Sequence, residues 1–498
     1  MDTIRTGTSA LAPHATHTRP PRPMRPRSAR TSRLAVAALL LAIAASLTAC
    51  SRGEGARIEF WTISLRPTFT DYIESRIEAF EDEHPGVEVV WVDVPFMAIE
   101  RKFIAAAAAG RAPDVINLSD MMFARFAAAG AFTDLDAVLP PDAESAYHPG
   151  ALEIGRLGGG LFALPWYLTT QATMSNEALL ARGGLTPDDL GTTWHDLMAR
   201  AEAFHERTGV CLFTQPLGQD SQLPMMLIAD ARPPFRAGPN GELVADLTRE
   251  DVRDYLAEWV RLYRAGVLPR ECVTRGFEHL IDVYQDERVA TLVTGVNFLG
   301  RIRDTARAVY DRTAVRPAIT GSLGRAHIAV MPVGVSAQSR DPALAASFAL
   351  HITSAESQAE FCRLATILPS TPEAFADRYF EGPTDAERAD GLEKVGEARA
   401  LVARTMDAAV PFTPAVECWP DLRRSFEANI KRVFLDDADL DETLERMQRE
   451  WQVIIDEMND RRAAAGVGPA LYSAVPTPAP AERASTAGVA TPRPGGDP

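Results

Sequence analysis

Hydrophobic and polar positions from residue 57 onward alternate between the period of a strand and that of a helix. Short apolar or β-branched runs predict strands, and stretches in which apolar residues recur every three or four positions predict helices. The expected strands are 58–61, 87–94 and 114–118, and the helices between them begin at Thr70 and Met97. This β-α-β-α-β order predicts an α/β fold with a parallel sheet and right-handed crossovers.

Ligands of such sheets bind at the carboxyl ends of the strands, so the residues there are candidates for a site. Trp61 follows the first strand, and Ser119 and Asp120 follow the third. The Asp120 carboxylate could accept hydrogen bonds from ligand hydroxyl groups, or Ser119 and Asp120 could simply cap the next helix. Trp61 could stack on a flat apolar ligand face or pack in the core. Both alternatives stay open on the sequence.

The rest of the chain predicts a second region of strands and helices. Apolar strands are expected at 210–214 and 289–294, with a helix opening near Thr193 and mostly helical chain at 422–462. A chain of 498 residues exceeds what one hydrophobic core usually serves, which predicts two lobes. Residues 470–498 are rich in Pro, Ala, Ser and Thr and have too few apolar side chains to pack, which predicts a disordered tail.

The first 49 residues have the composition of a secretory signal. A leader rich in arginine precedes an uncharged, largely apolar run at 34–48, which is shorter than the roughly 18 to 20 residues of a membrane-spanning helix. The ending Leu47-Thr48-Ala49-Cys50 resembles the bacterial lipobox, in which the cysteine is lipidated and becomes the mature N-terminus. We therefore expect a signal peptide at 1–49 and an extracytoplasmic protein anchored through Cys50, in a periplasm or on the outer face of the cell membrane. An ordinary cleaved signal that happens to precede a cysteine is the alternative.

The charge and the motifs exclude several classes of function. The formal net charge is −16, and removal of residues 1–49, which contain seven arginines and one aspartate, would bring it to −22. This balance argues against nucleic acid as a partner. The sequence has no nucleophile elbow, P-loop, dinucleotide fingerprint or metal-ligand motif, so we expect no enzyme activity, cofactor or metal site. The four cysteines beyond Cys50 permit disulfides in three possible pairings.

Short motifs follow one another in a fixed order along residues 57–465. They are IEFW at 58–61, FEDEHPGV at 80–87, GRAPDV at 110–115, LPW at 164–166, MSN at 174–176, TWHDL at 193–197, VATLVTG at 289–295, SAESQAEF at 354–361 and LPST at 368–371. In order and spacing they resemble the carbohydrate-type, maltose-binding-protein-like cluster of the extracellular solute-binding proteins of bacterial ABC importers.

The resemblance implies a two-lobed clamp in which each lobe is a sheet flanked by helices and the ligand cleft lies between them. Lobe one would comprise residues 57–165 and 325–366, and lobe two residues 168–320 and 370–465. The hinge would lie near 167–170, 321–325 and 367–370. A ligand that bridges two lobes favours the closed state by its differential affinity for that state.

The resemblance also implies which residues line the cleft. Trp61, Ser119 and Asp120 would act from lobe one, Trp166 and Tyr167 would lie at the cleft floor, and Gln219, Asp220, Asn297 and Trp419 would act from lobe two. Relatives often have an aromatic residue after the strand that ends near Thr294, where this chain has Asn297, which would offer an amide instead. Core packing remains the alternative for the tryptophans, and an exposed loop for Gln219 and Asp220. Two disulfides, Cys211 with Cys272 and Cys362 with Cys418, are implied more weakly.

The implied function is that of the substrate-binding component of an ABC transporter. It would be a monomer that captures a sugar or related polyol by hinge closure and delivers it to the membrane permease. A ligand-sensing lipoprotein without an importer and a lipid-anchored hydrolase are the alternatives. A carboxylate pair could imitate a glycosidase site, but acidic residues are too common in this chain to select one.

Overall fold

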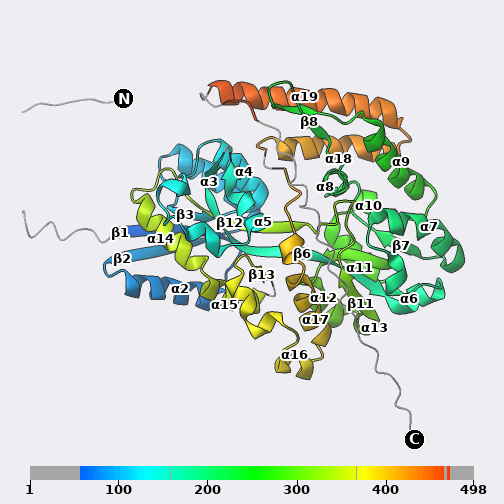
Figure 1. Ribbon diagram of the computed structural model, residues 1–498, viewed down its shortest axis with the longest axis horizontal. Coiled ribbons are helices and arrows are strands. Elements are labelled where there is room, and N and C mark those ends of the chain that lie inside the picture. The colour runs from blue at the N-terminus through cyan, green and yellow to red at the C-terminus, as the bar shows by residue number, and fades with distance from the viewer. Residues whose placement is uncertain (1–55, 158, 366, 415, 465–467, 471–498) are drawn as a thin grey trace, which may run out of the picture. The chain divides into compact units, whose positions relative to one another are not determined.

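The computed structural model describes residues 56–157, 159–365, 367–414, 416–464 and 468–470 (Figure 1). Internal contacts divide the chain into residues 1–56 and 57–498, and nearly all the described residues belong to the second unit. The expected signal peptide, Cys50 and residues 471–498 of the expected tail lie outside the described residues.

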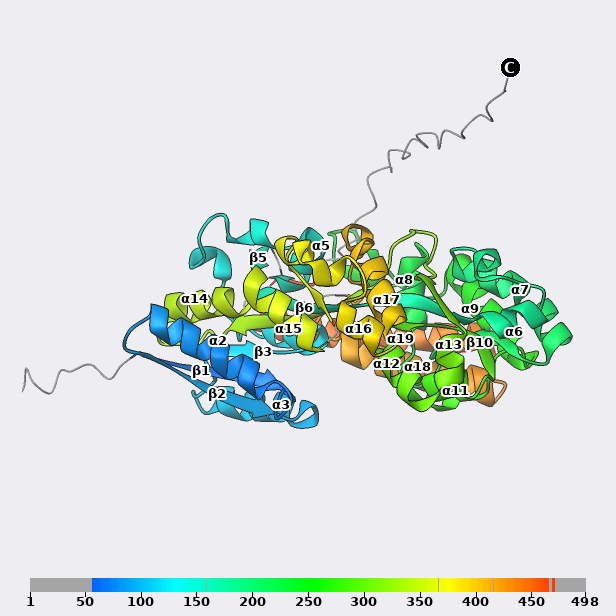
Figure 2. The ribbon, with the colours of Figure 1, turned by 90° about the horizontal axis from the view of Figure 1, so that it is seen from below.

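The first lobe is built on a sheet with the strand order β2-β1-β3-β12-β6. The three strands predicted from the N-terminal periodicity are confirmed as β1, β2 and β3, with β1 parallel to β3 and β12 antiparallel to it. The helices α2 and α14 lie side by side (Figure 2). The elements of this lobe are β1 (Ala56–Ile63), α2 (Thr70–Glu83), β2 (Val87–Val94), α3 (Phe96–Ala108), β3 (Val115–Asn117), α4 (Asp120–Ala128), α5 (Pro149–Leu152), β4 (Arg156–Leu157), β5 (Gly160–Leu161), β12 (Ile328–Val335), α14 (Pro342–Ile352) and α15 (Ala355–Ala365).

One long strand, β6 (Ala163–Asn176), belongs to both lobes. Up to Thr170 it pairs with β12 and with the short β13 (Leu368–Pro369), and from Gln171 onward it pairs with β10 and β11. The sheet therefore continues from one lobe into the other through a single strand, with the overall order β2-β1-β3-β12-β6-β10-β7.

The second lobe contains the remaining strands and most of the helices. Its strands β7 and β10 are parallel, and β10 is antiparallel to β6. Its elements are α6 (Glu177–Arg182), α7 (Trp194–Thr208), β7 (Cys211–Thr214), α8 (Leu223–Ala229), β8 (Phe235–Ala237), β9 (Leu243–Ala245), α9 (Glu250–Arg264), α10 (Glu271–Thr274), α11 (Phe277–Gln285), β10 (Val289–Gly295), α12 (Phe298–Thr305), α13 (Arg307–Asp311), β11 (Thr313–Pro317), α16 (Asp385–Ala389), α17 (Glu393–Ala403), α18 (Trp419–Leu435) and α19 (Leu440–Ala464).

Local sequence sets the limits of several of these helices. Thr193 caps α7 by accepting from the Asp196 N–H, while the Asp196 carboxylate accepts from the Thr193 N–H in return, which is a capping box. Gly209 ends the same helix at φ 71°, a left-handed conformation that glycine adopts without steric cost. The predicted helical stretch 422–462 is two helices, separated where Asp437 adopts φ 54°.

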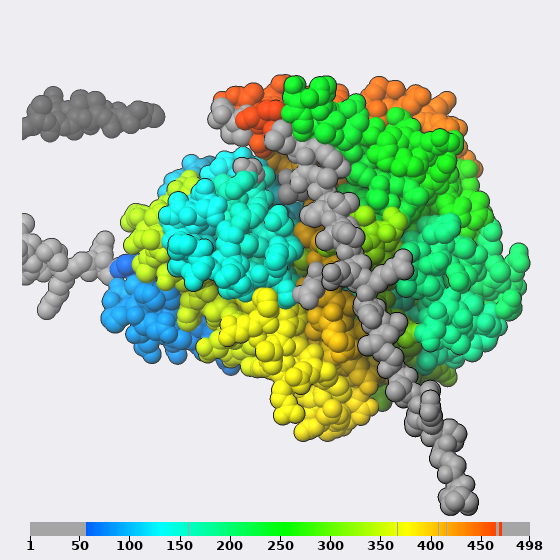
Figure 3. Space-filling model, viewed as in Figure 1, coloured from blue at the N-terminus to red at the C-terminus, as the bar shows by residue number. Residues whose placement is uncertain are grey.

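The hydrophobic cores follow the division of the sheet. Residues of β1, β3, α2, α14 and α15 form one hydrophobic cluster in the first lobe. A second cluster, to which α3 and α4 contribute, lies on the other face of the same sheet. The second lobe holds the largest cluster, to which α18 and α19 contribute, and α19 also packs against the β8–β9 hairpin (Figure 3). Among the described helices, none has the length and apolar character needed to cross a membrane. The expected α/β fold with two lobes is thus confirmed.

Candidate functional site

The three tryptophans expected in the cleft are buried in the hydrophobic cores. Trp166 is fully buried and stacks on Phe361 at 5.1 Å, and Trp419 is 2% exposed between Phe235 and Trp451. Their faces are occupied by protein, so in this structure neither indole is free to stack on a ligand. The placement of these two residues in the cleft is therefore corrected to core packing, the alternative that the sequence left open.

Trp61 is buried in the same way. Its indole N–H donates to Glu59 Oε1 at 2.6 Å, and the Lys102 ammonium lies 4.2 Å from the ring centroid. The ring is part of the cluster beneath α3 and α4. Trp61 lies within β1, which continues to Ile63, and its side chain points into the core, which corrects its expected role in the cleft.

Ser119 and Asp120 lie at the carboxyl end of β3, where the sequence placed them. Ser119 is the N-cap of α4, and its hydroxyl accepts from the Met122 N–H at 3.4 Å. Asp120 Oδ1 accepts from the Met121 N–H at 2.7 Å. The helix-capping alternative therefore holds for Ser119.

The Asp120 carboxyl faces residues of the other lobe. Burial raises the pKa of Asp120, and the Met121 N–H, the Thr413 hydroxyl and the Arg423 guanidinium each lower it. Thr413 and Arg423 belong to the second lobe, in α18 and the segment before it. Asp120 consequently lies at the junction of the two lobes, where a carboxylate can accept hydrogen bonds from a bound solute.

Tyr167 lies on the part of β6 that pairs with β12 and β13. Its half-buried ring meets Phe361 edge to face at 5.2 Å. Burial raises the pKa of Tyr167, with smaller contributions from Cys362 and Asp93. The phenol is thus a neutral donor near the point where β6 passes from one lobe to the other.

The polar turn after β7 and the end of β10 come together in the second lobe. Asp220 adopts φ 54°, and its Oδ2 accepts from the Phe277 N–H at 3.4 Å. Gln219 is exposed beside it, and Asn297 is exposed at the N-cap of α12. The rings of Phe277 and Phe298 link these two places, because they contact each other edge to face at 5.4 Å.

An ion pair of the second lobe, between Arg423 and Glu427, lies near the polar turn that contains Asp220 and Ser221. Arg423 Nε lies 3.5 Å from Glu427 Oε1, which also accepts from the Ser221 N–H at 3.2 Å. Burial raises the pKa of Glu427, and the nearby Asp220 carboxylate raises it further. Arg423 therefore interacts with Glu427 of its own helix and with Asp120 of the other lobe.

Sequence reasoning missed four of these residues: Phe277, Phe298, Arg423 and Glu427. Phe277 opens a helix after Gly276, where an added Cβ would collide with Asp220 Oδ2, so this glycine permits the close approach of the two loops. Arg423 and Glu427 are spaced i, i+4 in the first turns of α18, which is a weak signal because such pairs are common on solvated helix faces.

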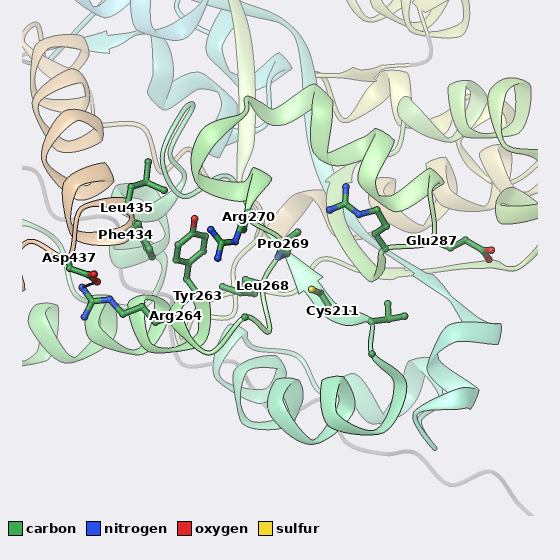
Figure 4. Close-up of a pocket in the computed structure, with 14 residues that line it drawn as sticks. Cys211, Tyr263, Arg264, Leu268, Pro269, Arg270, Glu287, Phe434, Leu435 and Asp437 are labelled. Atoms are coloured by element: carbon green, nitrogen blue, oxygen red, sulfur yellow. Dashed lines mark ion pairs between the residues drawn. The ribbon is translucent and has the colours of Figure 1, made fainter.

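A cavity of about 760 Å³ lies elsewhere, at the amino ends of β7 and β10 (Figure 4). Cys211, Tyr263 and Phe434 line it together with the ion pair of Arg264 and Asp437, which are 3.4 Å apart. Asp220 and Asn297 follow the opposite, carboxyl ends of the same strands. This cavity is therefore separate from the site at the lobe junction.

The four cysteines expected to pair are free thiols in the structure. Burial raises the pKa of Cys211 to about 11 and that of Cys418 to about 12, and it also raises the pKa values of Cys272 and Cys362. All four pack as small apolar side chains within the largest hydrophobic cluster, to which α15 contributes Cys362. The expected disulfides are thus corrected to four buried thiols. Within the described ranges, no group of three or more His, Cys, Asp or Glu side chains could hold a metal ion.

The comparisons with known proteins agree with this architecture. Residues 75–387 match the family described as bacterial extracellular solute-binding protein. A solved structure assigned as an oligosaccharide periplasmic-binding protein of Synechococcus sp. MITs9220 is 31% identical, with a TM-score of 0.71, and the match covers 81% of this chain and 99% of that one. The sugar-binding protein MalE of Xanthomonas citri shares the fold at 15% identity and a TM-score of 0.66, over 82% of this chain and 99% of its own.

A curated relative is an uncharacterized lipoprotein of Streptomyces antibioticus encoded in the 5′ region of oleD. It is 27% identical over 137 residues. That alignment spans 27% of this chain and 30% of the lipoprotein, so it covers less than a third of either.

Proposed function

The chain belongs to the bacterial extracellular solute-binding proteins, the substrate-binding components of ABC importers, and we propose that its solute is a saccharide or related polyol held between the two lobes. The observation that carries the proposal is the position of Asp120, a lobe-one carboxyl group whose pKa responds to Thr413 and Arg423 of lobe two. The 31% identity to the Synechococcus protein, whose assignment names an oligosaccharide, supports a carbohydrate as the solute.

We assign the solute contacts to polar and aromatic groups on both sides of the junction. Asp120 would accept hydrogen bonds from solute hydroxyls, and Gln219, Asp220 and Asn297 would do so from lobe two. Phe277 and Phe298 would contact the apolar face of the solute, the role that tryptophans have in many carbohydrate sites, because both rings are only half-buried. Ser119 and Tyr167 would support the site from the cap of α4 and from β6.

The proposed lobes are residues 57–165 with 325–366 and residues 168–320 with 370–465. The change of partner along β6 between Thr170 and Gln171 supports a hinge at 167–170. The segment 321–325 precedes β12, and β13 pairs with β6 at Leu168 and Tyr167, which supports the other two crossings. Closure about these points would bring Asp120 and Arg423 toward a solute from opposite sides.

The proposed location is extracytoplasmic, with Cys50 as a lipidated N-terminus on the membrane surface. The Leu47-Thr48-Ala49-Cys50 ending and the lipoprotein relative support this anchor. The proposed partners are the solute and the permease subunits of an ABC importer, and the protein would act as a monomer without catalysing a reaction on its solute.

A thermal-shift screen of the full chain against neutral mono- and oligosaccharides and polyols tests the proposal. A solute that binds only the folded state raises the melting temperature, by an amount that grows with its concentration relative to Kd. Calorimetry on each positive compound should then give a one-to-one complex that Asp120→Asn weakens. A complex that Asp120→Asn leaves unchanged would place the solute elsewhere.

A further inference from the structure

A small cavity of about 40 Å³ lies where the connecting segments of the two lobes meet. Gln171 of β6 lines it, as do Arg325 and His327 of the chain that leads into β12 and Phe412 beside them. Pockets for whole organic ligands usually have volumes of roughly 300 to 1,000 Å³. This cavity, called the hinge niche below, therefore has room for one small ion or one charged substituent and not for a sugar ring.

The lining of the hinge niche is rich in hydrogen-bond donors. It contains the Arg325 guanidinium and the side-chain amides of three glutamines, and none of its lining residues is Asp or Glu. Two of these amides, those of Gln215 and Gln222, already donate to backbone carbonyl groups, and of the three only the Gln171 side chain has no hydrogen-bond partner in the described ranges. The full lining consists of Gln171, Trp194, Gln215, Gln222, Met225, Met226, Ala229, Ile319, Thr320, Gly321, Arg325, His327 and Phe412. Within the described part of the chain, the Arg325 side chain has no ion-pair partner. A half-buried guanidinium without a counter-charge favours an anion from solution.

The His327 ring in the lining is neutral and is already engaged by the protein backbone. The Phe412 N–H donates to His327 Nδ1 at 3.1 Å, so the proton of the neutral ring is on Nε2. Burial lowers the pKa of His327 to about 4, and the ring is therefore neutral at physiological pH. The ring is also hydrogen-bonded to the Val410 backbone, so it adds no free donor to the niche. Arg325 supplies the charge, and the Gln171 amide, which has no side-chain partner among the described residues, supplies a further donor.

A neighbouring carboxylate does not neutralise this charge. Asp230 accepts from the Ser322 N–H at 2.7 Å and forms an ion pair with Arg232. It is engaged outside the niche and does not line it. The positive charge of Arg325 consequently remains available.

We infer that the hinge niche binds one small anionic group, a carboxylate, sulfate or phosphate, through the Arg325 guanidinium and the Gln171 side-chain amide. The group could be a free inorganic anion or an acidic substituent of the solute. The niche adjoins the lobe junction, since Met225 lines it and its sulfur contacts the Thr413 hydroxyl at 3.6 Å. The first source is independent of the proposed function, whereas the second rests on it.

The test uses the full chain, titrated with sodium sulfate, sodium glucuronate or glucose at constant ionic strength while heat of binding and melting temperature are recorded. We expect sulfate or glucuronate to bind, and we expect Arg325→Gln to weaken that binding at least tenfold. Arg340→Gln is the matched control, because Arg340 is exposed and likewise has no ion-pair partner in the described ranges. The melting temperature without anion shows that both variants are folded.

The two sources give different patterns. If sulfate binds at least as tightly as glucuronate, the result supports a free inorganic anion as the occupant. If glucuronate binds much more tightly than both sulfate and glucose, the result supports an acidic solute. Absence of binding by either anion, or equal weakening in Arg325→Gln and Arg340→Gln, overturns the inference. If the inference is overturned but neutral saccharides still bind to Arg325→Gln, the proposed saccharide-binding function is still supported.

Discussion

The rings of Phe277 and Phe298 meet edge to face, with centroids 5.4 Å apart and planes at 65°, although the two residues open different helices. Phe277 donates its backbone N–H to Asp220, and Phe298 follows Asn297 at the end of β10. The pair therefore joins the polar turn after β7 to the turn after β10. It provides half-buried aromatic surface at the carboxyl ends of the lobe-two strands, where a solute is expected.

Replacement of Phe298 by alanine should weaken saccharide binding. Loss of one aromatic contact at a binding surface typically costs about 2 kcal/mol, which corresponds to roughly thirtyfold in Kd. Calorimetry with a saccharide found in the thermal-shift screen measures the change. Tyr263→Ala is the control, because Tyr263 is half-buried and meets Phe434 edge to face at 5.2 Å beside the cavity at the opposite ends of the lobe-two strands. An equal change in both variants would argue against a contact between Phe298 and the solute.

Replacement of Trp419 by alanine should lower stability and leave the binding chemistry intact. The indole is 2% exposed at the start of α18 and packs on Phe235 and Trp451. Its removal leaves a cavity, and Trp→Ala changes in cores cost about 3 to 5 kcal/mol. Urea unfolding followed by circular dichroism gives the change in free energy of unfolding. A Trp419→Ala variant with unchanged stability and weaker saccharide binding would indicate that Trp419 contacts the solute after all.

The division into strands, helices and two lobes could be predicted because periodicity is a local property of the chain. The orientation of single side chains could not. Trp61 and Trp166 lie within β1 and β6, and Trp419 opens α18, yet all three face the cores. Trp91 lies within β2, where a strand pattern favours core packing, yet it is half-buried, with the Arg66 guanidinium 3.9 Å from its ring centroid.

These differences arise from contacts between segments far apart in sequence. The burial of Trp419 depends on the β8–β9 hairpin and on α19, and the approach of Arg423 to Asp120 depends on how α18 meets the other lobe. Neither relationship leaves a periodic signal. Residues whose position is fixed by the end of a strand were predicted more reliably, since Asp120, Asp220 and Asn297 do lie at the carboxyl ends of their sheets.

Replacement of Asp120 by asparagine should raise stability at neutral pH while it weakens binding. Burial raises the pKa of the folded-state carboxyl above its value in the unfolded chain. Below the unfolded-state pKa, the Asp120 carboxyl is protonated in both states and does not reduce the free energy of unfolding. As the pH rises through the folded-state pKa, ionisation of the buried carboxyl lowers the free energy of unfolding. Asparagine is never ionised, so the stability advantage of the variant should appear at pH 7 and vanish at low pH.

The measurement for Asp120→Asn is urea unfolding at several pH values between 3 and 7, with calorimetry for the solute. Loss of a hydrogen bond to a charged group should weaken saccharide binding by about tenfold or more. Glu287→Gln serves as the control, because Glu287 is at the opposite end of β10 and lines the large remote cavity. A variant with lower stability at pH 7, or with unchanged affinity, would contradict this account of Asp120.

The four cysteines of the described chain should react with thiol reagents only slowly in the folded protein. Raised pKa values keep them protonated at pH 8, and the thiolate is the reactive form. Cys211, at 9% exposed and lining the large cavity, should be labelled first, and all four should react after unfolding. Mass spectrometry of labelled peptides, without reductant, identifies the order. Detection of a Cys211–Cys272 or Cys362–Cys418 disulfide in the protein isolated from its native compartment would contradict the free thiols.

Cys50 should be the lipidated N-terminus of the mature protein. Lipid attachment there would hold an otherwise polar chain at a membrane surface, because each buried methylene of an acyl chain contributes about 0.8 kcal/mol of membrane affinity. Mass spectrometry of membrane-extracted protein should find a mature chain that begins at Cys50 and carries a diacyl or triacyl modification. Cys50→Ala should move the protein to the soluble fraction, whereas the neighbouring change Ser51→Ala should not. A mature chain that retains Ala49, or a Cys50→Ala variant that stays with the membrane, would favour an ordinary cleaved signal or another anchor.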